Sequence, residues 1–361
     1  MFDVIVVGLG AMGSSVAAHA AAKGLRVLAL EQFHPVHAYG ASHGRTRLIR
    51  QAYFEGSSYV PLLLRAYRLW DELEAQTAMS LRSRTGALYI GSAESALISG
   101  TLSSARKYGL AVEELDYEAL QRRFPVLAAL PTDVGVVERD AGVIFPEAAV
   151  RAHIQIAVAK GAQLRFGVRV ERWQALRGSR IRVVTQAGDT VEAASLVLCP
   201  GPWYESVTRA TDIPIKVERN VQFWFRPSDS QAFGPQHFQA FAIDRPGSKF
   251  FYGFPDYGDG VKCAFHHSGR YTTPDDLERD ISDGEIVQAH NSLGAVFPKA
   301  AGEFAGAMAC MYALTPDEHF VIGAHPGYHN VILAGGFSGH GFKFSPVVGE
   351  IVADLLVGAD P

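Results

Sequence analysis

The chain has 361 residues, of which 48% are hydrophobic and 19% are charged, and its formal net charge is −4. This composition is typical of a folded globular protein, and the length allows two domains. No block of basic residues points to nucleic acid or to an anionic membrane as a partner. No apolar run reaches the ~20 residues that a membrane-spanning helix needs.

The cysteines, Cys199, Cys263 and Cys310, are widely separated in the chain. An odd, sparse set without C-x-x-C spacing favours neither a disulfide framework nor a zinc site, so we expect no bound metal. The first residues, FDVIVVG, lack the basic segment and the cleavage site of a signal peptide. We therefore expect a cytoplasmic protein.

The first residues predict a strand, a glycine-rich turn and a helix. The apolar run at residues 2–7 is typical of a buried parallel strand. Gly8, Gly10 and Gly13 follow it in G-x-G-x-x-G spacing, and residues 12–23 predict an Ala-rich helix. Glycines at this spacing let backbone amides and a helix N-terminus approach a pyrophosphate.

A second strand, at residues 25–30, completes this nucleotide-binding pattern. Glu31 stands at its end, where a carboxylate accepts hydrogen bonds from a ribose diol. An acid at this position disfavours the 2′-phosphate of NADP. The pattern alone does not distinguish NAD from FAD.

A basic loop follows at residues 34–53. Its cationic residues are His43, Arg45, Arg47 and Arg50. A solvated basic turn is one interpretation. Apolar residues at positions 48, 49 and 53 and the neighbouring nucleotide pattern favour the other, a loop beside the cofactor. Residues 59–76 then predict an amphipathic helix.

The middle of the chain alternates short strands with helices. Predicted helices cover residues 95–108, 117–124 and 147–160. Predicted strands cover residues 87–90, 163–166, 168–173, 180–185 and 191–198, and Gly188 and Asp189 predict a hairpin turn between the last two. Residues 199–203 predict a second glycine turn, of the kind that can bring backbone close to a cofactor.

From residue 213 the pattern predicts an antiparallel sheet over the substrate pocket. The expected strands are residues 217–226, 238–243, 249–254, 260–267 and 303–312. Residues 274–292 predict a helix, and residues 320–322 begin the return to the nucleotide domain. The aromatic residues at 223–225 and 238–254 are expected to line the roof of the pocket.

Lys262 and His266 lie four residues apart on one predicted strand, so their side chains share a face. A lysine in a half-buried strand is unfavourable unless it is paired or functional. The alternative is an edge-strand lysine that prevents aggregation. Cys310, taken by itself, is typical of an inert buried thiol.

The C-terminal region predicts a glycine-rich turn that leads from a strand at 331–334 into an amphipathic helix. Lys343 falls in the first helical turn, where a cation is unfavourable at the positive end of the helix dipole. A bound anion would make this placement favourable. A solvated lysine is the alternative.

Several segments together resemble one known family. They are the pattern ending at Glu31, SHGRTRLIR at 42–50, the strand at 251–255, GVK at 260–262, CMY at 310–312, TPDEHF at 315–320 and GFSGHGFK at 336–343. Over essentially its whole length the chain resembles the monomeric sarcosine oxidase and N-methyltryptophan oxidase family of FAD-dependent amine oxidases.

The resemblance implies two domains. One is an α/β FAD-binding domain of the Rossmann-like, glutathione-reductase type, discontinuous over residues 1–86, 142–212 and 313–361. The other is an α+β substrate domain with a mainly antiparallel sheet, over residues 87–141 and 213–312. A monomer without nucleic-acid or membrane partners is expected.

The resemblance also implies roles for individual residues. Cys310 would carry the flavin through an 8α-S-cysteinyl bond, and Lys262 would promote oxygen reduction. Arg50 and Lys343 would hold the substrate carboxylate. The other catalytic residues implied are Arg47, Tyr252, His266 and Tyr312. The other cofactor contacts expected are Gly8, Gly10, Gly13, Glu31, His43, Thr46, Arg47, Gly201, Gly339, His340, Gly341 and Lys343.

The implied reaction is the oxidation of sarcosine by O2 and water to glycine, formaldehyde and H2O2. N-methyltryptophan, a cyclic imino acid such as pipecolate, or a fructosyl amino acid are alternative substrates. Two other classes stay open: an NAD-dependent dehydrogenase and a flavin-binding subunit without catalysis.

The chain departs from the family pattern at three places. Arg45 stands where the family often has an acid, residues 199–201 replace a small-residue turn, and the sequence ends at Pro361, where the family usually continues.

Overall fold

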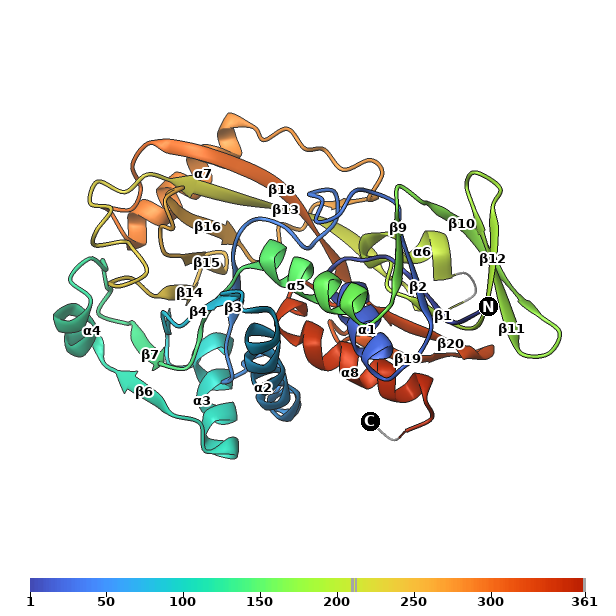
Figure 1. Cartoon of the computed structure of the whole chain (residues 1–361). Coiled ribbons are helices and arrows are strands. Elements are labelled where there is room, and N and C mark those ends of the chain that lie inside the picture. The colour runs from blue at the N-terminus through green and yellow to red at the C-terminus, as the bar shows by residue number, and fades with distance from the viewer. Residues whose placement is uncertain (209–210, 212, 360–361) are drawn as a thin grey trace.

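The computed structural model of the protein describes residues 1–208, 211 and 213–359. Its strands form two large sheets and one small one. The strands of the two large sheets gather at opposite ends of the molecule (Figure 1). No helix in the part of the chain that the structure describes is long and apolar enough to cross a membrane.

The first large sheet carries the predicted nucleotide-binding strands. Strand β1 (Phe2–Val7) pairs in parallel with β2 (Val27–Glu31) on one side and with β12 (Thr190–Leu198) on the other. The apolar run of β1 suits this position, because a central parallel strand is covered on both faces. The remaining strands of this sheet are β9 (Gln163–Phe166), β10 (Val170–Leu176), β11 (Arg180–Thr185), β19 (Val321–His325) and β20 (Tyr328–Gly335).

A layer of helices covers one face of this sheet. It is formed by α1 (Ala11–Ala22), α2 (Val60–Thr77), α5 (Pro146–Ala159) and α8 (Ser345–Leu356), which share one hydrophobic core (Figure 1). The short turn η3 (Phe342–Phe344) leads directly into α8. The glycine-rich segment before α8 is thereby fixed close to the start of α1 and to the core residue Trp70, whose indole N–H donates to the carbonyl of Lys343 at 2.9 Å.

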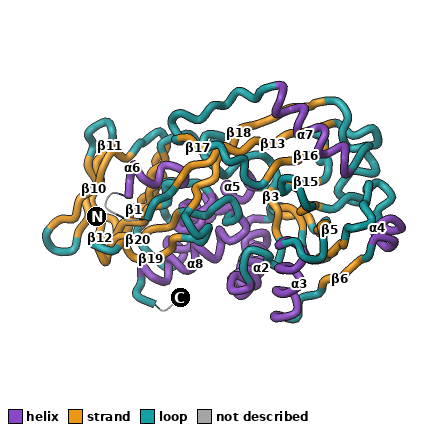
Figure 2. The backbone as a smooth tube through the Cα atoms, turned by 180° about the vertical axis from the view of Figure 1, so that it is seen from behind, coloured by secondary structure: helices purple, strands orange, loops and turns teal. Residues whose placement is uncertain are grey.

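The second large sheet is almost entirely antiparallel. Its order is β17 (Tyr271–Thr272), β13 (Lys216–Phe225), β16 (Val261–Phe265), β15 (Phe251–Phe254), β14 (Ala240–Asp244), β5 (Ala87–Gly91), β7 (Val134–Glu138) and β6 (Val112–Leu115). Among the described residues, β14 and β5 are the only parallel pair in this sheet. The long strand β18 (Phe304–Leu314) pairs with β13 along its length (Figure 2).

Smaller elements connect these layers. The small sheet contains β3 (Arg47–Ile49), β4 (Arg82–Ser83) and β8 (Gly142–Ile144). The other helices and 3₁₀ turns are η1 (Ser57–Tyr59), α3 (Ala96–Tyr108), α4 (Tyr117–Arg123), η2 (Gly201–Trp203), α6 (Tyr204–Thr208) and α7 (Asp283–Val296).

The expected fold class, an α/β part joined to a part with a mainly antiparallel sheet, is confirmed. One predicted element is wrong in its bounds: the helix expected at residues 274–292 is α7, which begins at Asp283. Ser282 and Glu285 form a capping box that fixes this start. The predicted domain boundaries stay a prediction, and the boundary at residue 212 lies outside the described residues.

Candidate active site

Two adjoining cavities lie against the second large sheet, and the larger of them also reaches the first. The larger one, of about 180 Å³, extends from Gly8 at the end of β1 to Cys310 on β18. The smaller one, of about 80 Å³, lies beside it against β14 and β15. Both cavities are lined by Arg47, Tyr312, Gly339 and Phe342, so an occupant of one would contact an occupant of the other.

The glycine turn after β1 forms one end of the larger cavity. Gly8 has a φ of +89°, and a Cβ there would lie 2.3 Å from the carbonyl oxygen of Cys199. Gly10 lines the cavity, whereas Gly13 packs its backbone against the carbonyl of Gly8. The three glycines therefore have two tasks, since two form the cavity wall and one permits α1 to approach the strand.

The carboxylate of Glu31 is held at the cavity wall by backbone amides. Leu9 donates its N–H to one carboxylate oxygen at 2.8 Å, and Phe33 donates to the other at 3.1 Å. His37 lies 3.3 Å from the same group. Gly201 also lines the larger cavity. The carboxylate is thus fixed in the position where the sequence places a ribose contact.

Cys310 lies at the other end of the larger cavity. Its thiol is buried, and an Nη atom of Arg47 lies 3.8 Å from the sulfur. Burial by itself would raise the pKa of this thiol, but His43 and Arg47 outweigh burial and lower it to about 6. The neighbouring cations therefore favour the thiolate form of Cys310, whereas its burial is also that expected of an inert thiol.

The Lys262 side chain lies against residues 44–46 of the basic loop. Strand β16 has neighbours on both sides, so the alternative of an edge-strand lysine is wrong. The Nζ atom donates to the carbonyl oxygens of Gly44 at 2.6 Å and Thr46 at 2.8 Å. Burial, and secondarily Arg47, lowers the pKa of Lys262 well below its usual value. Lys262 is not among the residues that line either cavity.

Arg45 stands away from both cavities. Its guanidinium forms an ion pair with Asp259, and its side chain is 56% exposed. The same guanidinium lies 5.8 Å from the ring centre of Trp224. The positive charge that this residue adds to the family pattern is therefore paired at the surface.

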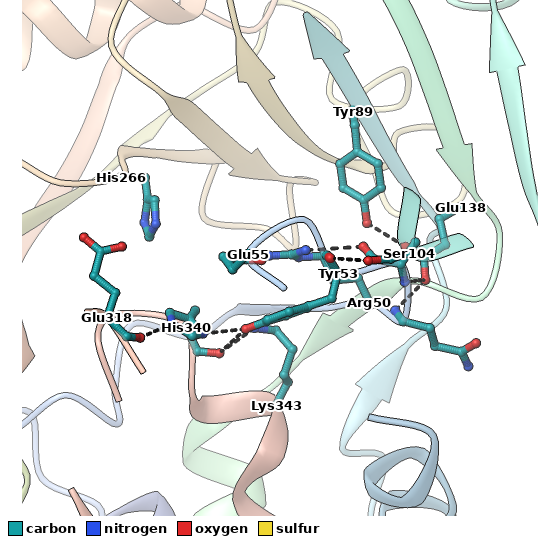
Figure 3. A network of polar contacts seen from close by, with 12 residues as sticks. Arg50, Tyr53, Glu55, Tyr89, Ser104, Glu138, His266, Glu318, His340 and Lys343 are labelled. Atoms are coloured by element: carbon teal, nitrogen blue, oxygen red, sulfur yellow. Dashed lines mark hydrogen bonds and ion pairs between the residues drawn. The ribbon is translucent and has the colours of Figure 1, made fainter. Parts of the chain in front are cut away.

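Arg50 and Lys343 bring two cations to the wall of the smaller cavity (Figure 3). Both are buried, with 3% and 5% of their surface exposed. Lys343 donates to the carbonyl of His340 at 2.5 Å and lies 3.4 Å from the hydroxyl of Tyr53. The alternative of a solvated lysine is therefore wrong. Burial and then Arg50 lower the pKa of Lys343 to about 7, and Glu55 opposes this shift.

Glu55 is the counter-ion of Arg50. The two form a buried ion pair, and the Arg50 guanidinium also lies 4.3 Å and 4.5 Å from the ring centres of Tyr53 and Phe54. Burial opposes ionisation of Glu55, but Arg50 and Lys343 lower its pKa to about 2. Arg50 and Lys343 thus share one internal carboxylate, that of Glu55. The smaller cavity can therefore accept a second carboxylate.

Neutral polar groups face these cations. The hydroxyls of Tyr252 and Tyr312 lie 3.2 Å apart, and Nδ1 of His266 lies 3.5 Å from the Tyr312 hydroxyl. Burial, followed by His267, lowers the pKa of His266 to about 3, so its imidazole is neutral. A Cβ on Gly339 would lie 2.5 Å from the Tyr312 ring, which explains a glycine there.

The structure thus brings most of the predicted residues together. Gly8, Gly10, Glu31, Gly201, Gly339 and Gly341 line the larger cavity, and His340 and Lys343 line the smaller one. His43 and Thr46 are buried beside Cys310 and Lys262 respectively, and neither lines a cavity. Within the described residues, no group of three metal-ligating side chains lies close enough to hold a metal ion.

The predicted roof of the pocket is only partly correct. Phe250, Tyr252 and Phe254 line the smaller cavity, but residues 223–225 do not. Phe223 and Phe225 instead belong to the core beneath the sheet. Glu55 was missed, although an acid two residues beyond the basic loop was a usable signal.

Known proteins resemble this chain over nearly its whole length. The model of a family described as DAO, FAD dependent oxidoreductase, matches residues 3–355. The chain is 42% identical to a monomeric sarcosine oxidase of Streptomyces avermitilis, covering 99% of this chain and 94% of the relative. It is 34% identical to an N-methyl-L-tryptophan oxidase of Salmonella dublin, with 99% and 95% covered.

Solved structures show the same fold. A mutant of NikD, an amino acid oxidase of nikkomycin biosynthesis, superposes with a TM-score of 0.87 at 24% identity, covering 99% of this chain and 93% of that one.

Proposed function

The chain belongs to the family of FAD-dependent oxidoreductases, and from this premise we propose that it oxidises small N-methyl amino acids. Sarcosine would be converted with O2 and water into glycine, formaldehyde and H2O2. One observation carries this proposal: the buried cations Arg50 and Lys343 line a cavity that adjoins the larger, glycine-walled one.

The residues of the larger cavity fit FAD. The glycine turn at Gly8 and Gly10 leaves room for a pyrophosphate, and the fixed Glu31 carboxylate can accept from a ribose. The far end, at Cys310 and Tyr312, meets the smaller cavity. When bound there, FAD would accept a hydride from the carbon next to the substrate nitrogen and pass the electrons to O2.

Arg50 and Lys343 would bind the carboxylate of the substrate. A guanidinium binds a carboxylate through two parallel hydrogen bonds, and an ammonium adds a compact charge. Glu55 already bonds to Arg50. Substrate binding would therefore share or replace that contact.

The opposite wall would receive the amine. In a protonated amine the nitrogen lone pair is used in the N–H bond and cannot assist oxidation. The substrate must therefore react as the free amine. The two cations of the cavity disfavour a positive charge on the substrate nitrogen and would lower its pKa. Tyr252, Tyr312 and the neutral His266 can hydrogen-bond to a neutral amine without adding charge.

Lys262 would act on oxygen. Reduction of O2 creates negative charge, and a fixed cation stabilises that charge without reorganisation. Two carbonyl acceptors, from Gly44 and Thr46, hold the Nζ atom in one place. Hydrogen bonds to these carbonyls favour the charged ammonium and so oppose burial and Arg47, which lower the pKa of Lys262.

We also propose that Cys310 would carry the flavin through a thioether between its sulfur and the 8α carbon. This bond would replace the S–H bond and one 8α C–H bond, and the two electrons released would pass through the flavin to O2. Two features support this: the thiol lies at the wall of the larger cavity, and Arg47 approaches its sulfur to 3.8 Å. A thiolate is the nucleophilic form of cysteine, and nearby cations favour it.

A cytoplasmic monomer is proposed as the working form. The described cysteines, Cys199, Cys263 and Cys310, are all free, which suits a reducing compartment. Size-exclusion chromatography with light scattering would test the monomer.

The function is tested by oxygen consumption and peroxide release across a panel of substrates. We expect sarcosine to be the best, with N-methyltryptophan, pipecolate and a fructosyl amino acid as competitors. Peroxide formed with none of these would overturn the proposal. A purified protein without a flavin spectrum that reduces NAD would instead establish a dehydrogenase.

A further inference from the structure

A buried carboxylate, that of Glu138, accepts hydrogen bonds from the backbone of the turn that carries Arg50. Glu138, at the end of β7, is 2% exposed. One of its carboxylate oxygens accepts the backbone N–H of Gln51 at 2.5 Å and that of Ala52 at 3.2 Å. The other accepts the hydroxyl of Tyr89 at 2.8 Å (Figure 3).

Helix α3 holds the same turn from another side. Ser104 donates its hydroxyl to the carbonyl of Tyr53 at 2.6 Å. A Cβ on Gly100 would lie 2.7 Å from the carbonyl oxygen of Phe54, so the helix backbone rests directly on the turn. Residues 50–55 are therefore attached to the substrate part of the molecule through their backbone.

The Arg50 guanidinium depends on this backbone. It donates to the carbonyl of Ala52 at 3.3 Å, within the very turn whose amides Glu138 accepts. Its other contacts, with Glu55 and with the rings of Tyr53 and Phe54, are also to residues of this turn. A displacement of the turn would move the guanidinium and all its local partners together.

We propose that Glu138 is a positioning residue for substrate binding: its carboxylate fixes the turn from which Arg50 reaches the substrate carboxylate. The role of Arg50 in this inference rests on the proposed function. Tyr89 takes part, because it lines the smaller cavity and donates to Glu138.

The choice of an acid has a physical reason. Two adjacent N–H groups and a hydroxyl converge on Glu138, and an ionised carboxylate accepts all three more strongly than a neutral group. Burial raises the pKa of Glu138, and the backbone amide of Gln51 is the main contact that opposes this shift. A glutamine would keep one carbonyl acceptor for the amides but lose the charge.

The test measures carboxylate binding by titration calorimetry on the flavin-loaded enzyme, with acetate as the probe. Glu138→Ala should raise the Kd of acetate about tenfold, which corresponds to about 1.4 kcal/mol. Glu138→Gln and Tyr89→Phe should each raise it about threefold. For the best amino-acid substrate, KM should rise by similar factors while kcat changes less than twofold.

Asp133→Ala provides the matched control. Asp133 is a buried carboxylate just before β7 that pairs with Arg245. Within the described part of the chain, it forms no hydrogen bond or ion pair with residues 50–55. The melting temperature of this variant should fall, as that of Glu138→Ala does. Its Kd for acetate should stay within twofold of wild type. A general loss of stability would thereby be separated from a loss of positioning.

A double-mutant comparison decides whether Glu138 acts through Arg50. In an Arg50→Ala background, Glu138→Ala should change kcat/KM less than twofold. An undiminished effect there would overturn the proposal, as would an acetate Kd within twofold of wild type in Glu138→Gln and Tyr89→Phe. These two milder variants decide the question if Glu138→Ala does not fold.

The outcome is distinguishable from that of the proposed function. Acetate binding that weakens in the Glu138 variants supports the inference even if no N-methyl amino acid is oxidised. Sarcosine oxidation with an unchanged acetate Kd in those variants supports the function and rejects the inference.

Discussion

The hydroxyl oxygen of Tyr53 lies 2.5 Å from Nδ1 of His340, and the Nζ atom of Lys343 lies 3.4 Å from the same hydroxyl. His340 is in turn fixed, because its Nε2 lies 2.9 Å from the carbonyl oxygen of Glu318. The basic loop and the glycine-rich turn before α8 are 287 residues apart, yet they meet in this network (Figure 3).

Tyr53→Phe should weaken carboxylate binding. The change removes an acceptor for the Lys343 ammonium and the partner of His340 Nδ1. We expect the Kd of acetate to rise about fivefold, the effect of a net hydrogen bond of about 1 kcal/mol. Titration calorimetry measures this. Tyr59→Phe is the control. The ring centres of Tyr59 and Tyr53 lie 5.4 Å apart, but the Tyr59 hydroxyl contacts His319 instead of Lys343 or His340. Equal Kd values for Tyr53→Phe and wild type would show that Lys343 does not depend on Tyr53.

Much of the fold was predictable because local signals agreed with tertiary packing. The helix expected at residues 95–108 begins after the Ser95 cap and ends at Gly109 in the left-handed conformation. The hairpin at Gly188 was predicted from its turn residues and is present between β11 and β12. In these cases the deciding contacts are made within a few residues of the chain.

The error at residues 274–282 has a tertiary cause. Asp275 accepts the indole N–H of Trp203 at 2.8 Å and pairs with Arg169 at 3.1 Å. Leu277 is buried in a small cluster with Trp203. These contacts with distant residues hold the segment in an irregular conformation. They cannot be read from the helical pattern of the local sequence.

The site was predictable in part for a similar reason. Arg50 and Lys343 were identified through the family resemblance, and the structure places both at one cavity. Glu138 could not be identified, because its partners are 49, 86 and 87 residues away and its strand shows no unusual pattern. Positioning residues of this kind depend on the packing of separate elements.

Lys262→Met should separate the two halves of the reaction. Substrate should still bleach the enzyme in the absence of O2, because Arg50, Lys343 and the cavity wall are unchanged. Return of colour after O2 is admitted should slow about 100-fold, the typical effect of losing one electrostatic stabiliser. Stopped-flow absorbance measures both phases. Lys299→Met, at an exposed lysine, is the control. Return of colour at the wild-type rate would exclude Lys262 from oxygen reduction.

Cys310→Ser should release the flavin on denaturation. A hydroxyl is not deprotonated near neutral pH, so it cannot replace a thiolate that Arg47 and His43 stabilise. Acid precipitation of the wild type should give a yellow pellet, and the variant should give a colourless pellet with a yellow supernatant. Cys263→Ser is the matched control, since Cys263 is also buried, and burial raises its pKa. A yellow pellet from Cys310→Ser would identify another attachment site.

Lys343 should make carboxylate binding depend on pH. Its pKa is lowered to about 7, so the ammonium is present below pH 7 and is lost as the pH rises through that value. The acetate Kd should therefore be lowest below pH 7 and rise by at most about tenfold per pH unit above it. The neighbouring groups titrate elsewhere: the pKa of Glu55 is about 2, that of His266 about 3 and that of His340 about 4.

Lys343→Met tests this assignment, because it removes the titrating group and keeps an apolar side chain of similar length. The variant should bind acetate more weakly at pH 6, and its Kd should change less than twofold between pH 6 and pH 9. Calorimetric titrations at half-unit intervals measure both profiles. A rise in Kd above pH 7 that persists in Lys343→Met would assign the titration to another group, because the Arg50 guanidinium, whose pKa is raised, stays charged throughout this range.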